Sequence, residues 1–268
     1  VTQEHLNSQA VDSPNYHRSI NDYFEAKKNI VRYQSKDNFV IVNTDYPNSV
    51  DLTKEAKSKV IYFSTENDLA EGSYLNDESL LMCLNDKCQL ITKRGEVFLR
   101  GNHNLQNVLA ASTAASIAGA NISDIGAVIK TFKGLEHRLE FVRDMDGVKF
   151  YNDSFSTTPE TAIAAIKSFT EPEIIILGGS EKGSDYMRLS HVIAKATNIR
   201  AVLLIGVTAG QIEMALKQCL IGIIPKKWII PKSGIILFNL GRGLSMDDIL
   251  AKANSLVKPG DVVLLSPA

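Results

Sequence analysis

The second half of the chain alternates regularly between helix-like and strand-like segments, and this pattern constrains the fold most. We predict strands at 173–177, 201–205, 235–238 and 261–265, and helices at 159–168, 186–197, 208–219 and 245–257. The predicted strands are short apolar runs, as expected of strands buried on both faces. Strands that alternate with helices form parallel sheets covered on both sides. We therefore predict an α/β fold with a mainly parallel sheet.

A predicted hairpin precedes this alternation. Two strand-like runs, 139–143 and 148–151, flank Asp146-Gly147, which is a strong signal for a tight turn. His137 and Arg138 come just before the hairpin, and Asp153 comes just after it, in a polar loop that leads into a helix. Polar side chains thus gather beside a helix N-terminus, which attracts anions. We expect chemistry at this place.

The first half of the chain has a less regular pattern. We predict helices at 20–33, 105–118 and 123–132, strands at 39–43 and 60–64, and antiparallel runs at 80–84, 88–92 and 96–99. The sequence around Gly72 has the composition of a turn. Residues 65–100 carry no catalytic signal. The closing Lys133-Gly134 predicts a boundary between two domains, 1–134 and 135–268.

Composition narrows the function classes. The 268 residues are enough for two domains with their own cores, and a hydrophobic content of 44% with 22% charged residues is typical of a soluble globular protein. A formal net charge of −1 provides no basic excess for nucleic acid or a membrane surface. The apolar runs are strand-sized, and no signal peptide is recognised. Cys83, Cys88 and Cys219 have no metal-ligand spacing and are interpreted as reduced thiols of a cytoplasmic protein. Cys83 and Cys88 flank a short polar turn, and we favour a structural role for them over a redox pair.

Several candidate residues carry little weight by themselves. His5 near a terminus and Lys27 on a helix are ordinary surface residues in most proteins, and asparagines such as Asn104 and Asn107 often cap a helix. The loop around Lys182, which follows Gly178-Gly179, could be only a tight turn after a strand. The segment 205–210 lacks a full dinucleotide-binding pattern, and we interpret it as structural.

Taken together, five segments resemble the Mur ligases. They are GLEHRLEFVRDMDGVKFYNDSFSTTPETAIAAI (134–166), GNHNLQNVLAA (101–111), LGGSEKGSD (177–185), VVLLSPA (262–268), and EHL (4–6) followed by YFEAKKNI (23–30). They occur in the family's order and cover nearly the whole chain. The resemblance implies the remnant of a central ATP-binding domain followed by a Rossmann-like C-terminal ligase domain.

The resemblance implies an activity and its ligands. Such an enzyme uses ATP and Mg²⁺ to join D-glutamate to UDP-N-acetylmuramoyl-L-alanine through an acyl phosphate, in the peptidoglycan synthesis of the cytoplasm. We expect a monomer that binds neither nucleic acid nor membrane.

The resemblance also implies roles for particular residues. His5 and a carbamylated Lys27 would hold magnesium and support catalysis; Asn104, Asn107, His137, Arg138 and Asp153 would hold the nucleotide; Thr157 and Lys182 would bind the incoming amino acid. A carbamylated lysine requires a partly buried site with a lowered pKa.

The sequence departs from the family pattern at several points. The motif G-x-x-x-x-G-K-[ST] does not occur, so we expect that the sequence lacks the N-terminal domain, the phosphate loop and the extreme C-terminus, and that it is inactive as a ligase by itself. Asn7 stands where an aspartate is usual, and the gap between His5 and Lys27 is longer than usual. Phe155 replaces a lysine that many members carry.

Two other interpretations stay open. Another Mur ligase, or a ligase like folylpolyglutamate synthetase, would share the fold and the chemistry but not the amino-acid pocket. A non-catalytic nucleotide-binding module would share only the fold. The full reading frame distinguishes them. The loop expected after Ala268 would separate the other ligases, because it carries much of the contact with glutamate, and the lack of an upstream phosphate loop would favour the non-catalytic module.

Overall fold

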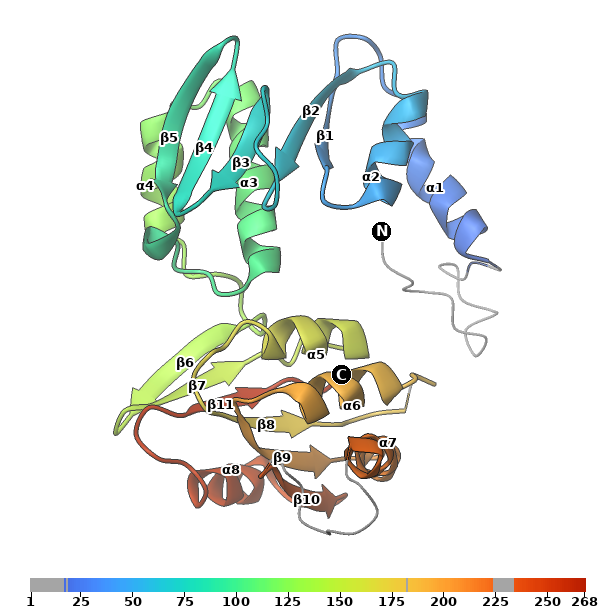
Figure 1. Ribbon diagram of the computed structural model, residues 1–268, viewed down its shortest axis with the longest axis vertical. Coiled ribbons are helices and arrows are strands. Elements are labelled where there is room, and N and C mark those ends of the chain that lie inside the picture. The colour runs from blue at the N-terminus through green and yellow to red at the C-terminus, as the bar shows by residue number, and fades with distance from the viewer. Residues whose placement is uncertain (1–16, 18, 182, 224–233) are drawn as a thin grey trace. The chain divides into compact units, whose positions relative to one another are not determined.

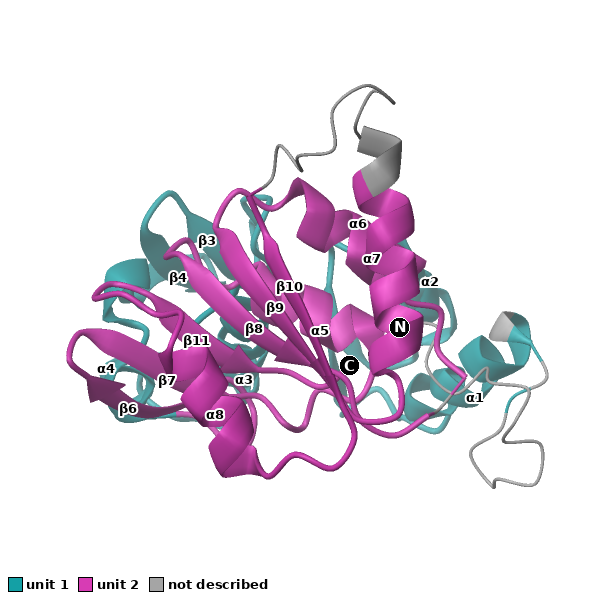
Figure 2. Ribbon diagram, turned by 90° about the horizontal axis from the view of Figure 1, so that it is seen from below, with its two compact units in different colours: residues 1–133 teal, residues 134–268 magenta. Residues whose placement is uncertain are grey.

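The chain divides into two compact units, Val1–Lys133 (unit 1) and Gly134–Ala268 (unit 2), which Figure 2 shows in separate colours. The computed structural model describes residues 17, 19–181, 183–223 and 234–268, and Figure 1 labels its elements. Each unit has its own sheet and its own hydrophobic clusters.

Unit 1 is built on a five-stranded sheet in the order β1-β2-β3-β4-β5. The strands are β1 (Phe39–Asn43), β2 (Lys59–Ser64), β3 (Gly72–Asn76), β4 (Ser79–Leu84) and β5 (Lys87–Lys93). The first three are parallel and the last two antiparallel. The helices are α1 (Ile20–Arg32), α2 (Pro47–Leu52), α3 (Asn102–Ile117) and α4 (Ile122–Thr131), with two short 3₁₀ turns, η2 (Thr53–Glu55) and η3 (Arg94–Glu96). Apolar residues of α3 and α4 pack against β2, β4 and β5 in one cluster.

The stretch expected to be a turn around Gly72 is instead strand β3, which joins the parallel and antiparallel parts of the sheet. Gly72 has a φ of +118°, and a Cβ there would lie 1.9 Å from the carbonyl oxygen of Tyr62 on β2. The glycine is therefore needed for a close approach between two strands. The strand predicted at 96–99 is not formed, and the 3₁₀ turn η3 occupies its start.

The two cysteines expected to be free thiols form a disulfide. Cys83 and Cys88 are directly opposite each other on β4 and β5, with Cα atoms 4.0 Å apart. The sequence prediction failed because it weighed metal spacing and compartment and not strand register, which places the two side chains together across a four-residue connection. Cys219 is a buried free thiol.

Unit 2 has a six-stranded sheet in the order β10-β9-β8-β11-β7-β6. Its strands are β6 (Glu140–Met145), β7 (Val148–Asn152), β8 (Glu173–Leu177), β9 (Ile199–Ile205), β10 (Ile236–Gly241) and β11 (Val262–Leu265). Its helices are α5 (Pro159–Ile166), α6 (Met187–Lys195), α7 (Ala209–Ile223) and α8 (Met246–Asn254). All neighbouring strands are parallel except the β6–β7 hairpin. The predicted α/β fold with a mainly parallel sheet is thus confirmed.

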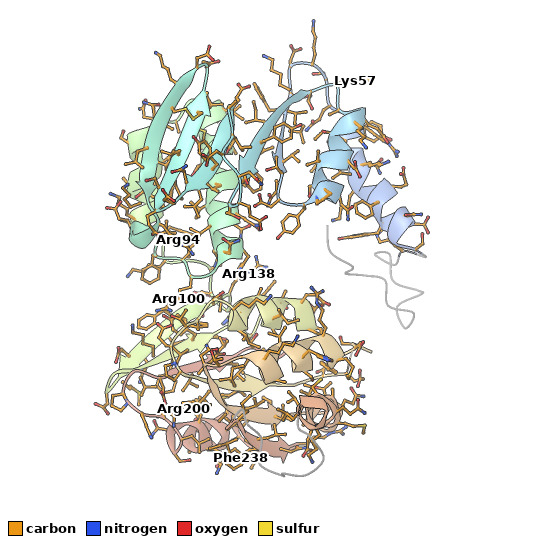
Figure 3. The ribbon with its side chains drawn as sticks, in the orientation of Figure 1. Lys57, Arg94, Arg100, Arg138, Arg200 and Phe238 are labelled. Atoms are coloured by element: carbon orange, nitrogen blue, oxygen red, sulfur yellow. A yellow bond between two sulfur atoms is a disulfide. The ribbon has the colours of Figure 1, made fainter. Side chains whose placement is uncertain are left out.

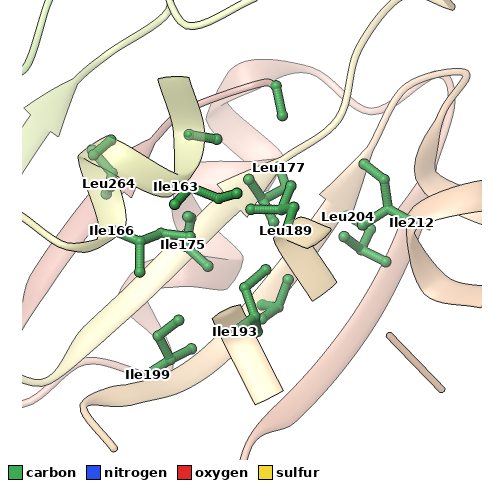
Figure 4. Packing of buried hydrophobic residues seen from close by; sticks show 14 of the residues in the cluster. Ile163, Ile166, Ile175, Leu177, Leu189, Ile193, Ile199, Leu204, Ile212 and Leu264 are labelled. Carbon is green, nitrogen blue, oxygen red and sulfur yellow. The ribbon is translucent and has the colours of Figure 1, made fainter. Parts of the chain in front are cut away.

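The alternation of side chains along the central strands explains the two layers of helices. On β8, Ile175 and Leu177 belong to a cluster with α5, α6 and α7, whereas Ile174 and Ile176 belong to a second cluster with α8. Figure 4 shows the packing in the first cluster, and Figure 2 shows α8 on the opposite face of the sheet. All four residues are fully buried, as expected of a strand covered on both sides.

A cavity of about 520 Å³ lies beside α8, on the face of the sheet formed by β6, β7 and β11. Its lining is mostly apolar, with Arg143, Asn152 and Asn254 as its polar members. None of the candidate site residues lines it.

Candidate functional site

The hairpin β6–β7 and the strand β11 bring two loops of unit 2 together. The first, residues 135–139, precedes β6 and is called the 137 loop; the second, residues 153–158, follows β7 and is called the 153 loop. The backbone N–H of Asp153 donates to the carbonyl of Leu265 on β11, at 2.8 Å, and that of Phe155 donates to the carbonyl of His137, at 3.0 Å. The carboxyl ends of parallel strands are the usual ligand edge of such a sheet.

The buried carboxylate of Asp153 joins the parts of this edge. It is only 4% exposed and accepts hydrogen bonds from the hydroxyl of Ser156, from the hydroxyl of Ser266 at 3.0 Å and from the backbone N–H of Leu139 at 3.0 Å. Both carboxylate oxygens are therefore used within the protein. Asp153 thus connects the 137 loop, the 153 loop and the residue after β11 by hydrogen bonds within the protein. The contact with a nucleotide that the resemblance implies stays a prediction.

His137 and Arg138 lie on the surface of the 137 loop. The ring Nδ1 of His137 is 2.9 Å from the carboxamide nitrogen of Asn152, and its backbone N–H donates to Glu140 at 2.8 Å. His137 and Leu139 have φ values of +64° and +44°, which non-glycine residues rarely adopt. The hydrogen bonds from the hairpin hold this strained backbone in place, and such strain is common at functional sites.

The guanidinium of Arg138 lies over the ring of Phe155, with its Cζ 5.3 Å from the ring centroid. Phe155 is 64% exposed. The two side chains come from different loops, so the position of the cation depends on both. Arg138 is labelled in Figure 3.

Thr157 is exposed at the end of the 153 loop, next to the start of α5. Thr158 is the N-cap of that helix, as predicted, and its hydroxyl accepts from the N–H of Thr161. Thr157 is thus placed beside a helix N-terminus without being needed to cap it.

Lys182 lies outside the described residues, so its side chain is not placed. The two glycines before it have a packing role. Gly178 has a φ of +106°, and a Cβ there would lie 2.2 Å from the carbonyl oxygen of Ile205. Gly206 lies in the segment interpreted as structural, and a Cβ added to it would lie 2.8 Å from the Cα of Gly179. The glycines let the ends of β8 and β9 approach each other.

In unit 1, Asn104 and Asn107 lie in the first turns of α3. Asn104 is buried; its carboxamide donates to the carbonyl of Arg100 at 2.8 Å and accepts from Asn107 at 3.3 Å. Asn107 is exposed, and among the described residues its Oδ1 has no hydrogen-bond partner. Asn104 therefore orients Asn107, and Asn107 offers the acceptor that a ligand could use.

Lys27 is exposed on α1, with its Nζ 5.1 Å from the ring centroid of Tyr23. The neighbouring Lys28 forms ion pairs with Glu25 and Glu55, both at 2.9 Å. The burial expected for a carbamylated lysine is not seen at Lys27 in unit 1 taken by itself. His5 lies outside the described residues.

A polar cluster in unit 1 escaped the sequence analysis. Asp45, just after β1, accepts from the hydroxyl and the backbone N–H of Thr65, both at 2.9 Å, from the hydroxyl of Ser64 at 2.5 Å and from Gln106 at 3.4 Å. The cluster joins the carboxyl ends of two parallel strands to the start of α3, beside Asn107. The signal was an acidic residue just past the carboxyl end of the predicted strand 39–43, which is where ligands of parallel sheets bind.

None of the helices in the described part of the chain has both the length and the apolar character that a membrane span requires. The described residues also contain no group of three or more His, Cys, Asp or Glu side chains placed to hold a metal ion.

Two domains of one family match successive parts of the chain. Residues 1–115 match the Mur ligase middle domain, and residues 137–268 match the glutamate ligase domain of the Mur ligases. Together the two matches leave out only the end of unit 1 and the junction between the units.

Curated relatives match over all or nearly all of this chain. The UDP-N-acetylmuramoylalanine--D-glutamate ligase of Thermoanaerobacter sp. is 34% identical over 270 residues, covering 100% of this chain and 54% of the relative. The protein of the same name from Acetivibrio thermocellus is 38% identical, covering 96% of this chain and 53% of the relative. The chain thus spans about half the length of the curated relatives it matches.

Solved structures show the same fold. The UDP-N-acetylmuramoylalanyl-D-glutamyl-2,6-diaminopimelate--D-alanyl-D-alanyl ligase of Acinetobacter baumannii has a TM-score of 0.65 at 15% identity, covering 92% of this chain and 52% of that one. The MurF ligase of Thermotoga maritima, solved in complex with ADP, has a TM-score of 0.61 at 17% identity, covering 94% of this chain and 55% of that one. At these identities the likeness concerns the fold alone.

Proposed function

This chain belongs to the Mur ligase family, and from this premise we propose that it forms the middle and C-terminal parts of an ATP-dependent ligase. The proposed reaction joins D-glutamate to UDP-N-acetylmuramoyl-L-alanine in peptidoglycan synthesis in the cytoplasm, by an enzyme that works as a monomer. The observation that carries the proposal is the match over 96–100% of the chain, at 34% and 38% identity, to two relatives named for this reaction.

The proposed reaction has two steps. A carboxylate oxygen of the muramoyl substrate attacks the γ-phosphorus of ATP, and ADP leaves. The amine nitrogen of D-glutamate then attacks the acyl carbon, loses a proton, and phosphate leaves. Such chemistry depends on positioning and on cations that balance the developing negative charge.

We propose nucleotide-binding roles for residues of each unit, taken separately. Asn107, oriented by Asn104, presents a carboxamide acceptor to the adenine edge, and His137 and Arg138 present polar and cationic groups to the rest of the nucleotide. A guanidinium suits phosphate oxygens because it can donate two parallel hydrogen bonds. Asp153 supports this site through its internal hydrogen bonds.

The amino-acid site we propose contains Thr157 and Lys182, with the charge of Lys182 pairing with a substrate carboxylate. Thr157 fits this role because it is exposed beside the N-terminus of α5, where a carboxylate is stabilised.

We propose His5 and Lys27 as the magnesium ligands, with a carbamylated Lys27 supplying the carboxylate-like oxygen. A bound Mg²⁺ would neutralise phosphate charge. The described residues of unit 1 do not by themselves assemble a ligand set around Lys27, so no step of the proposed reaction is assigned to these residues.

The test is a phosphate-release assay on the protein expressed from its full reading frame. Phosphate should appear only when ATP, UDP-N-acetylmuramoyl-L-alanine and D-glutamate are all present. L-glutamate and meso-diaminopimelate serve as matched alternatives. A rate that follows another amino acid would assign the chain to a different ligase, and ADP binding without turnover would assign it to a nucleotide-binding module.

A further inference from the structure

We propose that Phe155 is a positioning residue that holds the guanidinium of Arg138 ready for the phosphates of the nucleotide. This inference depends on the proposed function, because it assigns the nucleotide to the edge formed by the 137 and 153 loops. The contact itself is direct: the Cζ of Arg138 lies 5.3 Å from the centroid of the Phe155 ring.

Phe155 is a large apolar residue exposed in a polar loop. The residue is 64% exposed and belongs to none of the hydrophobic clusters of unit 2. Core packing therefore does not explain the residue. Its ring face instead attracts a cation, and a planar guanidinium stacks well on it.

The backbone reinforces this arrangement. The N–H of Phe155 donates to the carbonyl of His137 at 3.0 Å, and the N–H of Leu139 donates to Asp153 at 3.0 Å. These bonds hold the 137 loop on both sides of Arg138. The backbone hydrogen bonds hold the main chain of the 137 loop, and the ring of Phe155 holds the side chain of Arg138. The guanidinium is therefore ordered before a ligand binds. Such ordering increases affinity because less conformational freedom is lost on binding.

The position also concerns charge. In this chain the residue is neutral, and the cation beside it belongs to Arg138. Phe155 thus orients the cation of Arg138 and carries no charge itself.

The experiment uses the full-length protein and measures ADP and adenosine binding by calorimetry, together with the KM for ATP and kcat. Phe155→Leu should weaken ADP binding and raise the KM for ATP by about two- to fivefold, as expected from losing an exposed cation–π contact. Binding of adenosine, which has no phosphate, should not change. In the Arg138→Ala background, Phe155→Leu should have no further effect, because it acts only through the guanidinium.

Two further variants complete the design. Phe155→Tyr keeps the ring and should restore the affinity lost in Phe155→Leu. Phe238→Leu is the matched control, because it removes another aromatic–cation pair, in which the Nζ of Lys252 lies 3.9 Å from the ring centroid of Phe238. Phe238 lies on β10, the edge strand at the other end of the sheet (Figure 3), so this variant should leave ADP binding unchanged.

The outcomes separate the inference from the proposed function. Wild-type protein that binds no ADP would contradict the proposed function. Normal wild-type binding combined with an unaffected Phe155→Leu variant would overturn the inference alone. So would equal losses for ADP and adenosine, or additive effects with Arg138→Ala, because either result would mean that Phe155 contacts the nucleotide directly.

Discussion

At the residue scale, the buried carboxylate of Asp153 determines the shape of the candidate edge. It accepts from two hydroxyls and one backbone N–H. Asparagine in its place would point its NH₂ group, which is itself a donor, at groups that also donate. Asp153→Asn should therefore lower the free energy of unfolding of unit 2 by about 1–3 kcal/mol. Urea unfolding measures this change. The exposed Asp146, in the hairpin turn at a φ of +53°, is the control, since Asp146→Asn should change stability by less than about 0.5 kcal/mol. Equal effects would contradict the role of Asp153.

Glu173 gives unit 2 a pH-dependent stability. It is fully buried at the start of β8, and neither carboxylate oxygen has a partner among the described residues. Burial, with a smaller contribution from the negative charge of Glu171, raises the pKa of Glu173 from 4.5 to about 8. The folded state therefore keeps a proton that the unfolded state loses above pH 4.5. The stability contributed by this proton is full below pH 4.5 and is lost as the pH rises toward 8.

Glu173→Gln should remove this dependence, since glutamine has a similar shape and no titrating group. Between pH 5 and 8, the stability of the variant relative to wild type should increase by about 1.4 kcal/mol per pH unit. Urea midpoints at pH 5, 6, 7 and 8 measure the difference, and the subtraction cancels the contributions of other titrating groups. Parallel curves for the two proteins would show that Glu173 titrates normally.

At the element scale, the Cys83–Cys88 disulfide joins β4 and β5 across a short connection. Closing so short a loop in the unfolded chain should contribute about 2 kcal/mol to the stability of unit 1. A reducing agent should therefore lower the unfolding midpoint of unit 1, whereas the Cys83→Ser, Cys88→Ser double variant should not respond to it. Thiol titration in urea should find one free thiol, Cys219, in the oxidised chain. Three free thiols before reduction would mean that the bond does not form in solution.

The elements of unit 2 were predictable because each signal was local. The buried runs at β8 and β9, the turn at Asp146-Gly147 and the cap at Thr158 depend only on neighbouring residues. Strand β3 was missed because Gly72 was interpreted from its conformational freedom, when the decisive fact is the approach of Tyr62 from another strand. Long-range pairing of this kind has no counterpart in sequence spacing.

The candidate site was predictable only in part, for the same reason. Resemblance supplied the residue names, and the hairpin signal correctly brought His137 and Asp153 to one edge. Sequence could not show that Asp153 and Asn104 use their polar atoms within the protein, or that Arg138 stacks on Phe155. Burial and side-chain direction decide these points, and both depend on the folded chain.

At the scale of the whole molecule, the hydrophobic cores follow the division into units. The two clusters of unit 2 contain only residues from Leu139 onward, and the cluster of unit 1 ends at Ile129. Hydrophobic burial is the main favourable term in folding. A unit that contains its whole core should therefore fold by itself.

We accordingly predict that the isolated chain 134–268 unfolds in a single cooperative transition. Its urea midpoint should equal that of unit 2 within the 268-residue chain, because no described core residue is lost in the separation. Glu173→Gln provides an internal marker: its pH-dependent gain should be the same in both chains, since its neighbours on β9 and β11 lie within unit 2. Circular dichroism follows the transition. A lower midpoint for the isolated unit would show that unit 1 contributes to its stability, and a broad, non-cooperative transition would show that residues 134–268 do not form an independent domain.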